Sequence, residues 1–165
     1  MADTARWGLP MLEAGQAQKE MTVNEALARL DLLAQAAVVA TGLDTPPATP
    51  VEGQAWIVGS APTGIWAGQA RALAGWTVGG WRFVAPRDGM SVWSATDGCP
   101  VTFATGQWRV GRLAGTSVAI GGLQVVGARA AAIAAPTGGG VVDTEARATL
   151  AAVLGALRHH GLIAT

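Results

Sequence analysis

Apolar positions near the start of the chain recur at the spacing of a helix. Between about Gln16 and Thr41 they follow one another at intervals of three and four, which places them on one helical face. Thr22 followed by Glu25 has the pattern of a capping box, and Gly42 is a typical helix stop. The residues of the predicted apolar stripe are Leu27, Leu30, Ala34, Ala37 and Val38.

Between Val51 and Val110 the pattern changes to short apolar runs separated by glycine, which is typical of β-strands. Predicted turns at 78–81, 97–98 and 104–107 are of the kind that joins antiparallel strands. Six of the seven tryptophans lie here, so indole rings are expected to supply most of the core of a small antiparallel meander or open barrel. The predicted strands are 55–58, 64–67, 70–76, 81–85, 91–94, 101–104 and 107–110.

The last third of the chain combines two predicted strands, about 117–120 and 124–133, with a final helix. Asp143 is the expected N-cap, and Glu145 in the first turn complements the helix dipole. The apolar face of this helix is too short to stabilise it in water. We therefore predict that the helix packs on its own subunit or on copies of the chain around an axis. The residues of this oligomerisation face are Ala146, Leu150, Val153, Leu154 and Leu157.

These patterns predict an α+β fold in four parts. A helical module (1–44) is followed by a Pro-rich connector (45–50), whose three prolines stop a helix and favour extended backbone. The Trp-rich β domain (51–112) comes next, and a C-terminal β-plus-helix oligomerisation module (113–165) ends the chain.

Charge and composition exclude several classes of protein. Eleven basic residues balance eleven acidic ones, and charged residues are only 13% of the chain, which excludes an electrostatic nucleic-acid binder and a charge-rich disordered chain. Alanine and glycine supply 34 and 23 residues, so bulky apolar side chains are scarce and we expect burial to be completed in an oligomer. Cys99 is the single cysteine, which excludes an intrachain disulfide.

No targeting or membrane segment is predicted. The N-terminal residues lack the apolar core of a secretory signal, so we expect synthesis in the cytoplasm. The longest charge-free stretch, 53–70, contains Pro62 and four glycines, which argues against membrane insertion.

No catalytic or metal-binding spacing is found. The adjacent His159 and His160 would point about 100° apart on a helix and could not chelate one ion. Asp88 and Asp97 each precede glycine, which indicates turns instead of the paired carboxylates that a polysaccharide depolymerase or wall hydrolase needs. We therefore predict no catalytic residue, no metal and no cofactor, and a protein that is not an enzyme.

The Trp-rich region is the one place where the sequence favours binding. Indole faces stack on sugar rings, and arginine side chains can bind hydroxyl groups. The candidate sugar-binding residues are Trp66, Trp93 and Arg82, although packing in the core is the favoured role for most of the indoles.

The motifs along most of the chain carry a resemblance to a known family. LPMLEAGQAQKE at 9–20, TVNEAL at 22–27, and the blocks IWAG at 65–68, GWRF at 80–83 and APRDG at 85–89 resemble an uncharacterised Trp/Gly-rich family encoded in bacterial prophages and gene transfer agents. QVVGAR at 124–129 and VDTEAR at 142–147 resemble the end motif of phage fibre and spike proteins.

The resemblance implies a structural component of a virion or phage-like particle, either a head or tail spike, a tail fibre, or the base of a fibre. It implies no catalytic residues and a contribution to host attachment. The expected partners are copies of the chain, as a homotrimer or as a homopentamer at a fivefold vertex, and other particle proteins such as capsid, fibre or tail baseplate. The alternative is a carbohydrate-binding module that recognises host surface polysaccharide.

Overall fold

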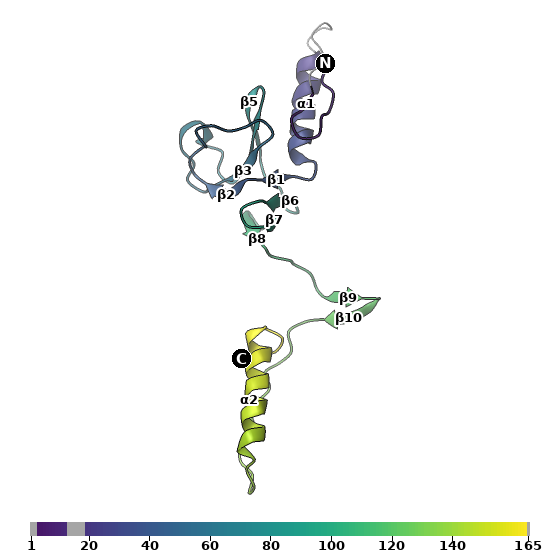
Figure 1. The fold of residues 1–165 in the computed structure, drawn as a ribbon, viewed down its shortest axis with the longest axis vertical. Helices are drawn as coiled ribbons and strands as arrows, with labels where there is room; N and C mark the ends of the chain where they lie inside the picture. The colour runs from purple at the N-terminus through teal and green to yellow at the C-terminus, as the bar shows by residue number, and fades with distance from the viewer. Residues whose placement is uncertain (1–2, 13–18, 165) are drawn as a thin grey trace. The chain divides into compact units, whose positions relative to one another are not determined.

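The computed structural model describes residues 3–12 and 19–164, and Figure 1 traces them by colour along the chain. They divide into two compact units, Met1–Arg112 and Leu113–Thr165. The elements of the first unit are α1 (Lys19–Leu33), β1 (Ala37–Val38), β2 (Ala40–Leu43), β3 (Ala55–Val58), the 3₁₀ helix η1 (Gly64–Trp66), β4 (Leu73–Thr77), β5 (Gly80–Val84), β6 (Ser91–Ser94), β7 (Cys99–Ala104) and β8 (Gln107–Val110). The second unit contains β9 (Val118–Ile120), β10 (Leu123–Val126) and α2 (Thr144–His159). An α+β fold with a helix before and after the strands is thus confirmed.

The N-terminal helix ends earlier than its apolar pattern predicts. α1 stops at Leu33, and Gln35 adopts a positive φ of 43°, a conformation that interrupts a right-handed helix. Ala37 and Val38 form β1, where the branched side chain of Val38 favours extended backbone, and Ala40–Leu43 form β2. The predicted stripe is therefore wrong beyond Leu33, and even within the helix Leu30 is exposed.

The predicted helix start at Thr22 is also wrong, because α1 already includes Lys19. Thr22 and Glu25 lie inside the helix, so they cannot form a capping box. Glu25 instead forms ion pairs with two arginines.

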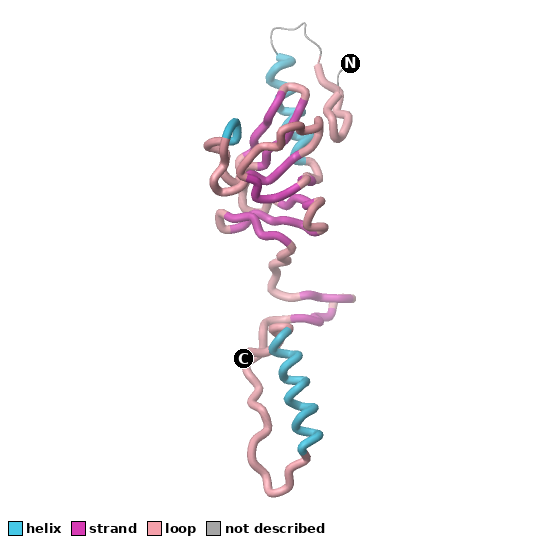
Figure 2. Tube along the Cα trace, turned by 60° about the vertical axis from the view of Figure 1, so that its left-hand side comes forward, coloured by secondary structure: helices cyan, strands magenta, loops and turns pink. Residues whose placement is uncertain are grey.

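Each of the two sheets of the first unit joins an antiparallel meander to one parallel strand. Figure 2 shows the strands in magenta. One sheet has the order β1-β6-β7-β8, and the other has the order β2-β3-β4-β5. The meanders confirm the predicted antiparallel pairing, whereas β1 and β2 pair in parallel with β6 and β3 at the sheet edges. These two parallel strands come from the segment that the sequence pattern assigns to a helix.

The helix, the Pro-rich segment and the Trp-rich strands belong to one unit. β2 pairs with β3 across the Pro-rich residues, and the Thr63 amide, in the segment after β3, donates at 2.7 Å to the carbonyl of Asp44, the residue that follows β2. The segment 1–44 is therefore not a separate module, because it supplies an edge strand to each sheet.

One apolar core lies where α1 and the two sheets meet. Gly75 in β4 permits the close approach of the helix, since a Cβ at this position would lie 2.6 Å from a methyl group of Leu32. The buried residues of this core are Leu32, Ala36, Val38, Ala55, Ile57, Leu73, Val92 and Val101.

A second core covers the opposite face of the β2–β5 sheet. Residues alternate along β3, so that Ile57 faces the first core and Trp56 the second. The segment 64–67, predicted as a strand, contains η1, which places Trp66 over this face. Five aromatic rings form the cluster: Trp56, Trp66, Trp76, Trp81 and Phe83.

The second unit consists of the β9–β10 hairpin, a long loop and α2. The Asp143 carboxylate accepts a hydrogen bond from the Ala146 amide at 2.9 Å, which confirms the predicted N-cap. The loop is joined to the end of the chain by hydrogen bonds from the Ala130 amide to the Leu162 carbonyl and from the Ala164 amide to the Ala130 carbonyl, at 2.9 and 2.8 Å. Backbone bonding, more than side-chain packing, thus holds this unit together.

Candidate functional site

Trp66 is a core residue, and its assignment to a sugar platform is wrong. Its side chain is 0% exposed, and its ring centroid lies 5.1 Å from that of Trp81 and 6.5 Å from that of Trp56. A stacking platform needs a free ring face. Both faces of this indole are covered by the protein, so it cannot present one to a sugar.

Trp93, in contrast, lies on an open sheet face. Its side chain is 51% exposed, and alternation along β6 directs it away from the core that contains Val92. The register places Pro100 beside it, and a shallow hollow lined by Ser91 and Gln35 adjoins the ring. A half-exposed indole with a neighbouring hydroxyl and amide is suitable for stacking on a sugar ring.

Arg82 does not join either tryptophan. Its Nε donates to Glu25 Oε2 at 2.6 Å, and its Nη1 donates to the carbonyls of Gly79 and Trp81 at 3.0 and 3.2 Å. In β5 the residues on either side of Arg82 belong to the aromatic cluster, so Arg82 lies on the opposite, α1-facing side of the sheet. The three predicted sugar-binding residues are therefore not brought together.

The carboxylate of Glu25 is bound by two guanidinium groups. Arg29, one helical turn further on, donates to Glu25 Oε1 at 3.0 Å, and Arg82 occupies the other oxygen. Burial alone would raise the pKa of Glu25, but the hydrogen bonds and positive charges of Arg82 and Arg29 outweigh it and hold the pKa below its usual value. The ion pair connects α1 to β5.

This pair should stabilise the protein in a pH-dependent way. Since the pKa of Glu25 is lower in the folded state, its contribution is present above the pKa of the unfolded chain and is lost as the pH falls through the folded-state pKa. Because both side chains are partly exposed, we expect Glu25→Gln to lower the free energy of unfolding by only about 0.5 kcal/mol at pH 7. Urea unfolding at pH 7 and pH 3 measures the difference, with Glu52→Gln as the control, and an effect of Glu25→Gln that is equal at both pH values would contradict the prediction.

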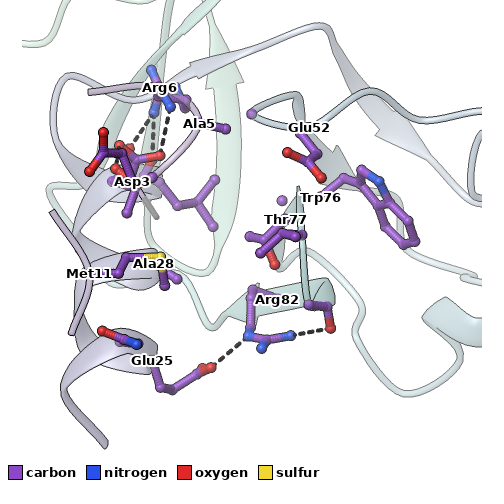
Figure 3. Close-up of a pocket in the computed structure, with 18 of the residues that line it drawn as sticks. Asp3, Ala5, Arg6, Met11, Glu25, Ala28, Glu52, Trp76, Thr77 and Arg82 are labelled. Carbon is purple, nitrogen blue, oxygen red and sulfur yellow. Dashed lines mark hydrogen bonds and ion pairs between the residues drawn. The ribbon is translucent and has the colours of Figure 1, made fainter. Parts of the chain in front are cut away.

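A cleft of about 660 Å³ lies between α1, the N-terminal loop and the β4–β5 hairpin (Figure 3). Ala28 and Glu25 line the helix side, Thr77 and Arg82 line the hairpin side, and Glu52 lies at the rim. This volume is within the range of pockets that hold small ligands or short peptide segments. The sequence pattern does not predict the cleft, because its walls come from segments far apart in the chain.

The N-terminal loop is fixed to α1 through a buried carboxylate that the sequence pattern also does not predict. Asp31 is 6% exposed and accepts hydrogen bonds from Thr4 Oγ1, the Arg6 amide and the Trp7 amide at 2.7, 3.0 and 2.7 Å. The guanidinium of Arg6 donates to the carbonyls of Asp31 and Leu32 at the end of the helix, where positive charge is favourable. An acidic residue in an otherwise apolar helical run was the only sequence signal for this arrangement.

The predicted oligomerisation face on α2 is mostly open to solvent within its unit. Leu150 and Val153 are each 50% exposed and Ala146 is exposed, whereas Leu154 is buried and Leu157 partly buried. Within the described part of this unit, Leu154 and Ile163 are the only buried apolar side chains. The face is available for packing against another surface.

Among the described residues, no three histidine, cysteine, aspartate or glutamate side chains are placed to hold a metal ion. No helix in this part of the chain is long and apolar enough to cross a bilayer. The described residues form an α+β protein with an open indole face, a cleft beside α1 and an α2 face that is mostly exposed within its own unit.

A family profile described as "Protein of unknown function (DUF2793)" matches residues 23–109. The match covers more than half of the chain, so the protein belongs to this family. It runs from α1 to the last strand of the first unit. No curated protein matches the chain.

Proposed function

We propose that the protein is a structural component of a phage-like particle, encoded by a prophage or a gene transfer agent, in which it forms a head or tail spike or the base of a fibre. It assembles with copies of itself, binds other particle proteins and contributes to attachment to the host surface. The motifs at 9–27 and 124–147 support the assignment to a phage-like particle. The exposed apolar side chains of the second unit support self-assembly.

The observation that carries this proposal is the number of apolar side chains that the second unit leaves in solvent. Twelve large ones are exposed from Leu113 onward, against two that are buried. In the β9–β10 hairpin every residue is exposed, on both faces of the sheet. Burying a large apolar side chain contributes about 1.5–3 kcal/mol, so packing against copies of the unit would supply the stability that it lacks alone.

We expect the full chain to be oligomeric, with a mass near three or five times 16.7 kDa by light scattering after size exclusion. Leu150→Ser combined with Val153→Ser should lower that mass or raise the concentration at which the oligomer forms about tenfold or more, because both side chains lie on the exposed face of α2. The matched control is Ala148→Ser with Ala152→Ser on the opposite face of α2.

A mass of one chain across a tenfold range of concentration would contradict self-assembly. Equal effects of the two double variants would contradict the assignment of the α2 face. The location is tested by electron microscopy of particles from a strain that lacks the protein, in which a spike or fibre should be missing; particles with every appendage in place would contradict the structural role. A trimer would favour a fibre, and a pentamer would favour a fivefold vertex.

A second candidate function, binding of host surface polysaccharide, is favoured by the open face around Trp93. The half-exposed indole adjoins Ser91 and Pro100, and Thr102 and Arg109 continue the same face along the neighbouring strands. This arrangement could bind sugar hydroxyls while one ring face stacks on the sugar. The function is compatible with a place in a spike.

Titration with purified host capsular polysaccharide, followed by tryptophan fluorescence, tests this candidate. The wild type should show a saturable change that Trp93→Ala removes. Trp7→Ala, which removes an indole of similar exposure elsewhere in the first unit, should retain it. No change at about millimolar sugar would contradict binding.

A further inference from the structure

The cleft beside α1 has an apolar floor because small residues line it. Ala28 lines the α1 side and Thr77 lines the β4 side, whereas Gly75 of β4 is buried beneath Leu32. Met11 and Met21 add unbranched side chains, which adapt their shape to what they contact. The floor thus offers room and apolar surface to side chains that enter from outside.

The charge left unneutralised around the cleft is negative. Arg82 is paired with Glu25, and Arg6, which donates to the carbonyls at the end of α1, lies beside the Asp31 carboxylate. In contrast, no cation among the described residues lies within 4 Å of the Glu52 carboxylate at the rim. Figure 3 shows Glu52 apart from Glu25, whose carboxylate is already paired with Arg82. A ligand with a positive charge between apolar groups would match this surface.

Polypeptide of this chain already packs at one end of the cleft. The N-terminal loop borders one end of the cleft, where its backbone amides donate to Asp31 and the cation of Arg6 reaches the end of the helix. The open part of the cleft continues this contact along α1 toward Glu25. A second segment of polypeptide could therefore extend an interface that the loop has begun.

We propose that the cleft docks a short extended segment of a partner protein in which a lysine or arginine is flanked by apolar side chains. The apolar residues contact Ala28, Met11 and Met21, and the cation lies near the Glu52 carboxylate. The residues that line the cleft come from the first unit alone. The site does not include residues of the α2 face or of the surface around Trp93. The docking proposal therefore does not depend on self-assembly of the chain.

The test uses the full chain and three fluorescein-labelled peptides, Gly-Leu-Lys-Leu-Gly and its counterparts with glutamate or glutamine at the centre, followed by fluorescence polarisation. We expect the lysine peptide to bind with a Kd below about 1 mM and at least about tenfold more tightly than the glutamate peptide. The glutamine peptide should fall between them, because it retains the apolar contacts without the charge.

Two variants, each with a matched control, locate the binding. Ala28→Met fills part of the cleft and should raise the Kd of the lysine peptide at least about tenfold. Ala26→Met, at an exposed position of the same helix, should leave this Kd unchanged. Glu52→Gln should raise the Kd of the lysine peptide about fivefold and reduce the preference for lysine over glutamate. Asp88→Asn, in an exposed turn, should change neither.

Three results would overturn the proposal. They are the absence of saturable binding by the lysine peptide, equal binding of the lysine and glutamate peptides, and binding that neither Ala28→Met nor Glu52→Gln weakens. Because Glu52 is exposed, its substitution keeps the test valid even if Ala28→Met disturbs the fold.

Discussion

Trp66→Ala should lower the free energy of unfolding by about 4 kcal/mol, because it removes the fully buried indole of the aromatic cluster and leaves a cavity. Urea unfolding, followed by circular dichroism, measures the loss. Trp93→Ala is the matched control, since its ring is half-exposed and lies outside both apolar cores, and its effect should stay within about 1 kcal/mol. Equal losses in the two variants would contradict the assignment of Trp66 to the core.

A phenylalanine at the same position should restore most of the stability. Phenylalanine keeps an aromatic ring in the cluster. It also loses no hydrogen bond, because the buried Nε1 group of Trp66 has no hydrogen-bond partner among the described residues. We expect Trp66→Phe to lower the free energy of unfolding by about 1–2 kcal/mol, through the smaller ring volume alone. A loss as large as that of the alanine variant would indicate a bound partner for Nε1.

Asp31→Ala should lower the free energy of unfolding by about 3 kcal/mol and release the N-terminal loop. The substitution leaves the amides of Arg6 and Trp7 and the hydroxyl of Thr4 without their shared acceptor. Urea unfolding measures the stability, and the rate of tryptic cleavage after Arg6 measures the release of the loop.

Asp31→Asn and Asp88→Ala are the controls for this prediction. The asparagine keeps one acceptor oxygen and should have an intermediate effect on both measurements. Asp88 lies in an exposed turn, so its substitution should change the free energy of unfolding by no more than about 0.5 kcal/mol. Cleavage after Arg6 at the wild-type rate in Asp31→Ala would contradict the role given to this carboxylate.

The sequence predicts those elements whose signals are local. The strands 55–58, 91–94 and 107–110 were predicted with the bounds that the structure shows, because glycine or turn residues flank each apolar run. Thr105 and Gly106 both have positive φ, as the predicted tight turn requires. Asp143 capping α2 depends only on residues of its own helix.

Elements that depend on distant partners were not predicted. Ala34, Ala37 and Val38 fit a helical stripe, yet the last two form β1 because β6, more than 50 residues further on, offers an edge to pair with. Trp66 and Trp93 look alike in sequence, and only the packing of η1 and the alternation of β6 decide which ring is buried. The cleft and the Asp31 contacts likewise require segments that meet only in the folded unit.

The continuity of β1 and β2 has a consequence for cooperativity. One short stretch, residues 37–43, supplies an edge to both sheets, and the amide of Val39 within it donates to the Ala55 carbonyl at 2.8 Å. Neither sheet can release this stretch without disturbing the other, so partial opening of one sheet costs contacts in both. The first unit should therefore unfold in a single transition, with slowly exchanging amides distributed over both meanders, even though each meander is formed from residues adjacent in the chain.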